Sequence, residues 1–179
     1  MQKKAELMDR DAVMRALKRM SHQIIERNSG VDRVCLVGIQ RRGVPLAEML
    51  RSEIEKIEGV SVPIGYLDIT LYRDDLEHDV EDPELHGSYI PFEVNGAIVI
   101  LVDDVIYTGR TARAAIEAVF SYGRPAEIQL ASLIDRGHRE LPIRPDYVGK
   151  NIPTSHSEIV SVRVEEHDGS VGVDIYNKI

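Results

Sequence analysis

The chain has 179 residues, enough for one domain with a sizeable core, and we expect a single domain over residues 1–179. Its formal net charge of −8 argues against general affinity for nucleic acids, although a local basic surface can override that total. With no Trp and two Phe, the core must be built from Val, Ile, Leu and Ala, as in α/β proteins with buried parallel strands.

Further features of the sequence bear on the compartment. The first residues are polar and the apolar runs are short, so we expect neither a signal peptide nor a membrane span. The single cysteine, Cys35, lies in an apolar run and is expected to be a buried, unreactive thiol. Together these features predict a cytoplasmic protein.

The first predicted element is an amphipathic helix over residues 9–28, whose apolar stripe includes Val13, Leu17 and Ile24. Basic side chains share another face of this helix or follow it, namely Arg15, Lys18, Arg19, His22 and Arg27. A solvated surface is the ordinary explanation for such a row, and an anionic macromolecular partner is the alternative.

A buried strand is predicted over residues 34–39, followed by the loop 40–43 and by a helix whose first turn carries Pro45. Residues 60–71 alternate in polarity and predict one or two strands. Residues 72–88 are rich in Asp and Glu and cannot bury themselves, because their like charges repel. This acidic segment is expected to be a flexible loop, either a solvated excursion or a lid.

The next stretch carries the strongest functional signal. An apolar run over residues 98–102 ends in Asp103 and Asp104, which predicts a central parallel strand whose carboxyl end opens onto a polar site. Thr108, Gly109 and Thr111 then lead into a predicted helix over residues 112–120. Its N-terminus offers backbone N–H groups and the positive end of the helix dipole, an anion site of single-phosphate size. Two carboxylates before such a site suit a sugar phosphate. They can accept hydrogen bonds from the sugar hydroxyls or contact them through a bound Mg²⁺.

The remaining chain predicts a strand over residues 128–134, a short edge segment over 146–151 and a β-hairpin over 159–176 with Asp168-Gly169 at its turn. The alternation of strands and helices predicts an α/β fold, a mostly parallel twisted sheet flanked by helices on both faces. A small hood from Asp135 onward and the C-terminal hairpin complete it. The loop 40–43 would then join the anion site at one edge of the sheet, as a two-phosphate substrate requires.

Residues 98–111 resemble the phosphoribosyl-diphosphate (PRPP) motif of type I phosphoribosyltransferases: an apolar strand, two acids, two apolar residues, one variable residue, then Thr-Gly-x-Thr. This resemblance implies the type I phosphoribosyltransferase fold, makes the loop 40–43 a pyrophosphate loop and favours a lid over the PRPP site for residues 72–88. Purine enzymes of the family carry Lys where this chain has Asp135, and Asp where it has Tyr107. Both departures point away from purines and toward uracil.

Three segments, 68–76, 102–111 and 135–144, together resemble the bacterial pyrimidine operon attenuation regulators, which are also uracil phosphoribosyltransferases. The resemblance implies two activities. One converts uracil and PRPP to UMP and diphosphate. The other binds the 5′ leader of pyrimidine biosynthetic mRNA when UMP is plentiful, and so promotes transcription termination. It also implies a homodimer or homotetramer. A plain pyrimidine-salvage phosphoribosyltransferase without RNA regulation is the alternative.

The resemblance assigns a role to each candidate site residue. Asp103 and Asp104 would hold the ribose hydroxyls and steer PRPP, with Mg²⁺ bound mainly through PRPP. The 5′-phosphate would be held by Asp103 and Asp104 together with Tyr107, Thr108, Gly109, Arg110 and Thr111. The pyrophosphate loop comprises Gln40, Arg41, Arg42 and Gly43, and Arg73 or Arg136 could reach the pyrophosphate after lid closure.

Base and RNA contacts complete the assignment. The uracil pocket would include Ile106, Tyr107, Asp135, Arg136 and Gly137, and backbone N–H groups around Arg136-Gly137 would donate to the uracil carbonyls. The RNA contacts would come from the basic residues of the first helix together with His138, Arg139, Arg144 and Lys150. We expect these two groups to converge into one basic surface, although a surface ion pair explains each residue taken singly.

Overall fold

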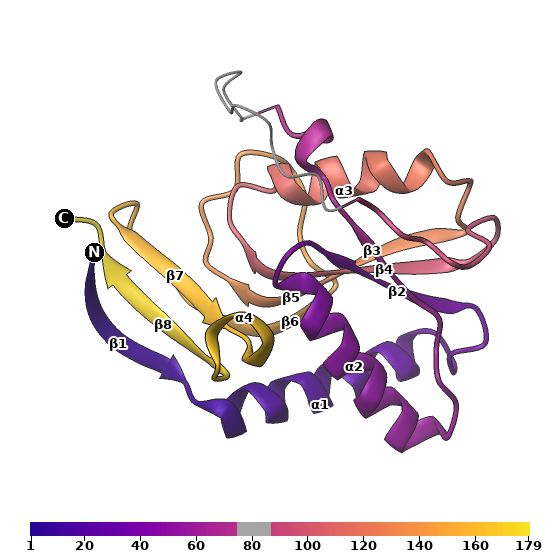
Figure 1. The fold of residues 1–179 in the computed structure, drawn as a ribbon, viewed down its shortest axis with the longest axis horizontal. Helices are drawn as coiled ribbons and strands as arrows, with labels where there is room; N and C mark the ends of the chain where they lie inside the picture. Colours follow the sequence, from indigo (N-terminus) through magenta and orange to yellow (C-terminus); the bar gives the residue numbers. More distant parts are fainter. Residues whose placement is uncertain (75–86) are drawn as a thin grey trace.

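In the computed structural model, which describes residues 1–74 and 87–179, a five-stranded parallel sheet forms the centre of the molecule (Figure 1). The strand order is β3-β2-β4-β5-β6. The strands are β2 (Val34–Ile39), β3 (Ile64–Leu67), β4 (Ile98–Ile106), β5 (Glu127–Asp135) and β6 (Tyr147–Asn151). The mostly parallel sheet predicted from the sequence is therefore confirmed. Of the predicted lid, residues 75–86 lie outside the described residues.

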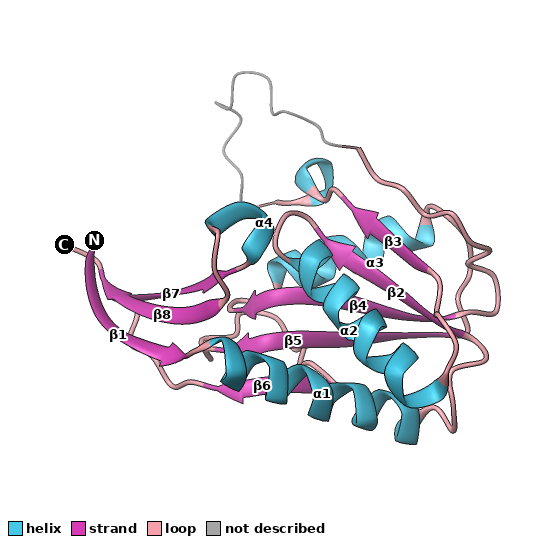
Figure 2. Cartoon of the chain, turned by 60° about the horizontal axis from the view of Figure 1, so that its bottom comes forward, coloured by secondary structure: helices cyan, strands magenta, loops and turns pink. Residues whose placement is uncertain are grey.

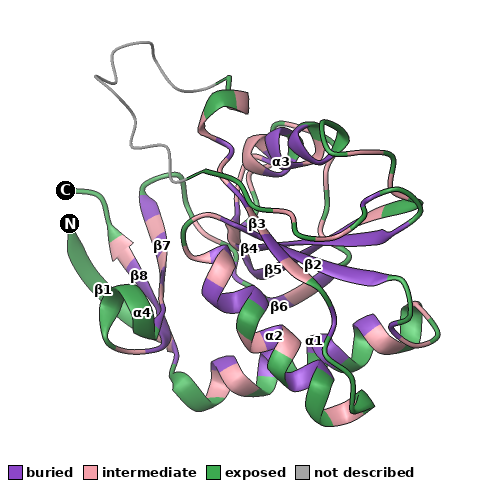
Figure 3. Cartoon of the chain, turned by 45° about the vertical axis from the view of Figure 1, so that its right-hand side comes forward, coloured by how far each residue is buried: buried purple, intermediate pink, exposed green. Residues whose placement is uncertain are grey.

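Helices cover both faces of this sheet, as predicted. Helices α1 (Arg10–Arg27) and α2 (Gly43–Glu58) lie on one face, and α3 (Arg110–Phe120) lies on the other, near the short 3-10 helix η1 (Thr70–Tyr72) (Figure 2). Leu17, Leu50 and Ile54 from the helices pack with Ile100 and Leu133 from the strands. Because the strands are covered on both sides, successive residues of β2 and β4 are buried (Figure 3).

The central strand is longer than predicted. β4 does not end before the two acids but continues through them to Ile106, because its pairing with β5 extends to the register pair Ile106–Asp135. The helix after it begins at Arg110, two residues earlier than predicted. Asp103 and Asp104 are thus held by a strand, and the turn between this strand and α3 is shorter than expected.

Cys35 is buried in β2, as predicted, and burial raises the pKa of its thiol to about 11. The thiol therefore stays protonated at neutral pH, consistent with an unreactive core residue. None of the helices in the described part of the chain has the length and apolar character needed to cross a membrane.

A second, antiparallel sheet lies beside the first and consists of β1 (Gln2–Met8), β8 (Gly172–Asn177) and β7 (Glu158–Arg163), in that order. Together with residues 136–144, here called the hood loop, it corresponds to the predicted hood. The two strands of the predicted C-terminal hairpin are confirmed. β1 was not predicted, because its exposed residues show no apolar alternation.

The connection between β7 and β8 differs from the predicted two-residue turn. It contains a single helical turn, α4 (Glu165–Asp168), in which the N–H of Asp168 donates to the carbonyl oxygen of Val164 over 2.8 Å. The carboxylate of Asp168 accepts from the N–H of Val164 over 2.9 Å, and Gly169 ends the turn with a φ of 64°. Asp168-Gly169 therefore ends a helical turn, and its side chain caps that turn.

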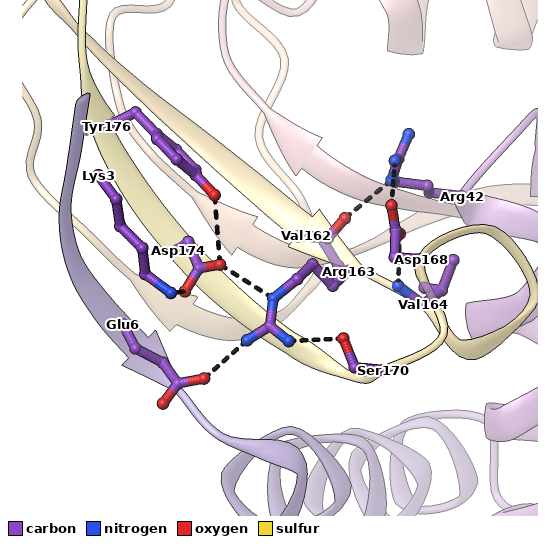
Figure 4. Close-up of polar contacts among 10 residues, drawn as sticks. All are labelled: Lys3, Glu6, Arg42, Val162, Arg163, Val164, Asp168, Ser170, Asp174 and Tyr176. Atoms are coloured by element: carbon purple, nitrogen blue, oxygen red, sulfur yellow. Dashed lines mark hydrogen bonds and ion pairs between the residues drawn. The ribbon is translucent and has the colours of Figure 1, made fainter. Parts of the chain in front are cut away.

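Ion pairs hold the small sheet together (Figure 4). The carboxylate of Asp174, 1% exposed, lies 2.9 Å from Nζ of Lys3 and 2.9 Å from Nε of Arg163. Arg163 also pairs with Glu6 of β1 over 2.6 Å and donates to Oγ of Ser170 over 2.7 Å. Burial by itself raises the pKa of Asp174, but the bonds from Lys3 and Arg163 outweigh it, so the pKa is lowered. The sheet therefore depends on this carboxylate being ionised.

We expect Asp174→Asn to lower the free energy of unfolding at pH 7 by about 3 kcal/mol, because it leaves the Arg163 guanidinium without its buried counter-ion. Urea denaturation measures this change. Because the folded pKa of Asp174 is lowered, its stabilisation is present above the unfolded pKa of about 3.9 and is lost as pH falls through the folded pKa.

The Asn variant should therefore lose less stability than the wild type on acidification below about pH 4. Asp32→Asn, a change at an exposed loop residue, is the matched control and should follow the wild-type profile. Identical acid profiles for Asp174→Asn and the wild type would contradict this account of the small sheet.

Candidate functional site

An acid pair lies at the carboxyl end of the central strand. Asp103 is 8% exposed, and its carboxylate accepts from the N–H of Asp104 over 2.9 Å. Asp104 is half-buried and accepts in the same way from the N–H of Val105, also over 2.9 Å. Burial raises the pKa of Asp103 well above its ordinary value, the adjacent charge of Asp104 raises it further, and the charge of Arg73 opposes the shift. A buried carboxylate in this state gains from any cation or hydroxyl donor that reaches it.

The turn after this strand, residues 107–111 and here called the phosphate turn, leads into α3. Gly109 occupies the N-cap position with a φ of 94°, a left-handed conformation that favours glycine. No side chain caps the helix. Oγ1 of Thr108 accepts from the N–H of Arg110 over 3.3 Å. An uncapped helix N-terminus with hydroxyl groups beside it can bind an anion, as predicted for the 5′-phosphate.

The hood loop holds the phosphate turn in place. The N–H groups of Glu140 and Leu141 donate to the carbonyl oxygen of Thr108 over 2.9 and 3.1 Å. Arg139 donates from Nη1 to the carbonyl oxygen of Tyr107 over 2.7 Å and from Nη2 to the carboxylate of Asp135 over 2.6 Å. Arg139 was predicted to contact RNA, and that role stays a prediction. Its contacts in the structure make it a bridge between the hood loop and the phosphate turn.

The Arg110 side chain, predicted to hold the 5′-phosphate, forms ion pairs within the protein. Its guanidinium pairs with Glu140 over 2.7 Å and with Asp74 over 2.9 Å. The hydrogen bonds to these two carboxylates raise the pKa of Arg110 above its ordinary value. The Arg110 side chain therefore joins the phosphate turn to the hood loop, and its backbone N–H donates to Thr108.

The predicted pyrophosphate loop, residues 40–43, lies directly beside the acid pair. A side-chain carbon at Gly43 would overlap the carbonyl oxygen of Val102 and would lie 3.5 Å from the Cα of Asp103. Only glycine permits this approach, which brings the N-terminus of α2 against β4. Helix α2 also lacks a side-chain cap, so two uncapped helix N-termini flank the acid pair.

Arg42 does not line this loop with its side chain, contrary to the prediction. Its Nε donates to the carbonyl oxygen of Val162 in β7 over 2.8 Å, and its guanidinium pairs with Asp168 over 2.9 Å (Figure 4). These bonds link the start of α2 to the small sheet. Gln40 donates from its side chain to the carbonyl oxygen of Gly87 over 3.1 Å, so it connects the loop to the segment that follows residues 75–86.

Aromatic and imidazole rings gather where the predicted uracil pocket lies. The Arg136 guanidinium stacks on the Tyr107 ring, 4.0 Å from its centroid. The His138 ring lies edge-on to Tyr107 with centroids 5.9 Å apart, and the His156 ring lies 4.0 Å from that of His138. The Tyr107 hydroxyl lies 3.5 Å from Nδ1 of His156. These contacts bring polar rings together beside the phosphate turn, and the uracil pocket there stays a prediction.

Two groups expected to bind substrate already have partners within the protein. The N–H of Arg136 donates to the carbonyl oxygen of Ile106 over 3.2 Å, and that of Gly137 donates to the Asp135 carboxylate over 3.0 Å, so both expected donors already have partners. The Arg136 guanidinium is buried, donating to Thr154 and to the carbonyl oxygens of Ser155 and Glu158. It cannot turn to a pyrophosphate without breaking these bonds.

The sequence analysis missed His156. It lies in a polar segment, residues 153–157, between the edge strand and β7, where no apolar periodicity marks an element. Only its spacing from the edge strand could have indicated that it returns to the uracil pocket. Glu140 was missed as the carboxylate that holds Arg110, because a single acid in a loop carries no distinctive pattern.

Of the second predicted basic group, Lys150 lies in β6, the strand that contacts α1, and the convergence of the whole group with α1 stays a prediction. Arg19 of α1 donates to the carbonyl oxygen of Gly149 in β6, and Arg27 pairs with Asp146 over 2.6 Å just before that strand. Lys150 extends from β6 toward the carbonyl oxygen of Leu7 at 3.4 Å. We define the basic surface as the predicted RNA contacts that lie exposed on α1 and β6, namely Arg15, Lys18, Arg19, His22, Arg27 and Lys150.

The described residues contain no group of three or more His, Cys, Asp or Glu side chains placed to hold a metal ion. The acid pair has hard oxygen ligands of the kind that Mg²⁺ prefers, but two carboxylates leave most of an octahedral shell to other ligands. The donor set therefore fits an ion that is carried largely by a bound phosphate substrate.

Known proteins are similar to this chain over most of its length. A family model described as the phosphoribosyl transferase domain matches residues 4–167. The bifunctional protein PyrR of Acetivibrio thermocellus is 61% identical over 166 residues, 93% of this chain and 90% of that protein. The bifunctional protein PyrR of Clostridioides difficile is 58% identical over 175 residues, 98% of this chain and 99% of that protein.

Solved structures share the fold. The hypoxanthine phosphoribosyltransferase of Trypanosoma cruzi has a TM-score of 0.74 at 17% identity, covering 99% of this chain and 98% of that one. That of Staphylococcus aureus has a TM-score of 0.71 at 18% identity, covering 99% and 94%. At these identities the likeness concerns the fold alone.

The domain match and the relatives agree over nearly the whole chain, and the resemblance found in the sequence is confirmed. The chain belongs to the bifunctional PyrR family of type I phosphoribosyltransferases.

Proposed function

We propose that the family's two activities, uracil phosphoribosyltransfer and UMP-dependent regulation of pyrimidine operon RNA, use two adjoining regions of this chain. The first is the site formed by the acid pair, the phosphate turn and the pyrophosphate loop. The second is the basic surface. The observation that carries the proposal is the buried acid pair flanked by two uncapped helix N-termini. Such an enzyme and regulator would work in the cytoplasm.

PRPP fits this arrangement group by group. Its 5′-phosphate would bind at the N-terminus of α3, and its diphosphate would lie against the loop 40–43 at the N-terminus of α2. The ribose hydroxyls would donate to Asp103 and Asp104, which relieves the desolvated carboxylate of Asp103. Asp103 and Asp104 would also hold Mg²⁺ carried by PRPP, and the bound ion would offset negative charge on the diphosphate.

In the reaction, a bond forms between N1 of uracil and C1 of the ribose as the bond from C1 to diphosphate oxygen breaks, and uracil loses its N1 proton. The protein contributes positioning and electrostatic stabilisation, with no covalent nucleophile. The sugar fixed by the acid pair and the phosphate turn is presented to a uracil beside Tyr107. The ring of Tyr107 is oriented by the stacked Arg136.

RNA would bind the basic surface along α1 and β6, which concentrates positive charge on an otherwise acidic molecule. A hairpin loop suits such a surface, because its phosphates pair with Arg and Lys and its unstacked bases contact His and Arg. UMP would strengthen this binding if RNA prefers the nucleotide-bound arrangement of the hood loop. A homodimer or homotetramer would present the surface more than once. The plain salvage enzyme is the less favoured alternative.

Removal of either acid tests the enzyme site. We expect Asp103→Asn and Asp104→Asn each to lower kcat/KM for PRPP by about tenfold or more, because a charged acceptor of the ribose hydroxyls is lost. Steady-state assays of UMP formation measure this effect, with Asp32→Asn as the matched control at an exposed position. Wild-type activity in both acid-pair variants would remove them from the mechanism.

Although Asp103→Asn should lower activity, we expect it to raise the free energy of unfolding at neutral pH. Because the folded pKa of Asp103 is raised, the unfolded chain ionises first and the wild type loses stability as pH rises from about 4 toward the folded pKa. The Asn variant has no such loss. Thermal unfolding without ligands should therefore find it more stable than the wild type at pH 7 and nearer to it at pH 4. A variant that is less stable at both pH values would contradict the burial argument.

The basic surface is tested by Arg15→Gln, which removes an exposed charge from α1. We expect weaker binding to a pyrimidine operon leader hairpin and unchanged uracil turnover. The slope of the logarithm of the binding constant against the logarithm of the salt concentration should fall by about one, which corresponds to one lost phosphate contact. Equilibrium titrations across a salt series, with and without UMP, measure the effect. Arg33→Gln, an exposed charge in the loop before β2, is the control. If Arg15→Gln and Arg33→Gln lose equal RNA affinity, binding depends on the total charge of the protein and not on the basic surface.

A further inference from the structure

We propose that a cavity on the outer side of the hood loop, here called the outer cavity, receives one unpaired nucleobase of the bound RNA. This inference rests on the RNA-binding function proposed above and assigns a base-binding subsite to it. The outer cavity has a volume of about 420 Å³, within the range of small-ligand pockets. Its walls include Asp135, His138, Arg139, Arg144, Asn151 and Pro153.

The chemistry of these walls suits a base rather than a phosphate alone. Arg144 and Asn151 are exposed and provide hydrogen-bond donors, and the amide of Asn151 also provides an acceptor. Pro153 and the imidazole of His138 provide flat surfaces on which a ring can pack. Asp135 adds a carboxylate, which disfavours a bare phosphate and favours a group that carries N–H donors.

The cavity begins at the end of the strand that carries part of the basic surface. Asn151 is the last residue of β6, directly after Lys150, and Arg19 of α1 binds the same strand at Gly149. An RNA backbone that follows α1 and β6 therefore reaches the cavity at the end of the strand. The surface would hold phosphates, which carry no sequence information, and the cavity would read one base.

The cavity also shares a residue with the nucleotide site. Arg139 lines the cavity and donates to the carbonyl oxygen of Tyr107 in the phosphate turn. Its Nε–H is buried and has no hydrogen-bond partner among the described residues, so the guanidinium has a donor to offer when it reorients. His138 next to it has a φ of 62°, an uncommon conformation for a residue other than glycine. A nucleotide bound at the phosphate turn would therefore contact an element that shares Arg139 with the outer cavity.

The test combines an RNA series with one protein variant. Leader hairpins carrying a single abasic nucleotide at each unpaired loop position are titrated with the wild type and with Asn151→Ala, in the presence of UMP. We expect one loop position at which loss of the base weakens wild-type binding about tenfold, a value typical of a stacked base. With the abasic nucleotide at that position, Asn151→Ala should weaken RNA binding little further. At other positions, the fold losses of affinity caused by the abasic nucleotide and by Asn151→Ala should multiply.

Controls separate this inference from the functions on which it rests. Arg33→Gln should leave the abasic profile unchanged, and uracil KM should be the same in Asn151→Ala and the wild type. A raised uracil KM in Asn151→Ala would overturn the proposal, because it would place the cavity in the enzyme site. The proposal would also be overturned if the intact hairpin binds tightly and the effects of the abasic nucleotide and of Asn151→Ala are independent at every loop position. That result would still establish RNA binding. A wild type that fails to bind the intact hairpin would overturn the RNA function itself.

Discussion

The burial of the Asp103 carboxylate at the end of β4 is the constraint on which the site depends. A carboxylate is costly to desolvate, and a second acid beside it raises that cost. The burial results from close packing around the acid pair. Gly43 brings α2 against the strand, and Gly109 turns the chain sharply into α3. The same packing that desolvates the acid thus places two helix N-termini beside it, so the cost to the fold is offset when a polyanion carrying hydroxyls or a cation binds.

Three arginines near this site act as structural braces. Arg42 joins α2 to the small sheet, Arg136 joins β5 to the segment before β7, and Arg139 joins the hood loop to the phosphate turn. The guanidinium has several donors in a fixed plane, so it can bind carbonyl oxygens from two segments at once. In this molecule the three guanidinium groups connect neighbouring segments through hydrogen bonds to carbonyl oxygens.

These arginines also show what the sequence could and could not predict. The strands of the central sheet, the three long helices and the phosphate turn follow from local signals, namely apolar runs, helical periodicity and the residues flanking them, and these were predicted. Strand β1 and the helical turn α4 carry no such signal and were not predicted. The end of β4 was misplaced because pairing with β5 carries two acids into the sheet, which is a tertiary effect. An arginine beside an expected anion site was read as a ligand for the same reason: charge is visible in the sequence, but the carbonyl oxygens that compete for it, such as that of Val162, are not.

On the proposals made above, Arg139 would connect the enzyme site with the RNA-binding region. A sensor needs one element whose arrangement both ligands affect, since a ligand indifferent to two states cannot shift them. The guanidinium of Arg139 binds the phosphate turn through the carbonyl oxygen of Tyr107, binds Asp135 on its other side, and lines the outer cavity. A nucleotide fixing the phosphate turn would change the partners available to this side chain. The enzyme's product site and the RNA surface would then share one hydrogen-bonding residue, so that binding at either would affect the other equally.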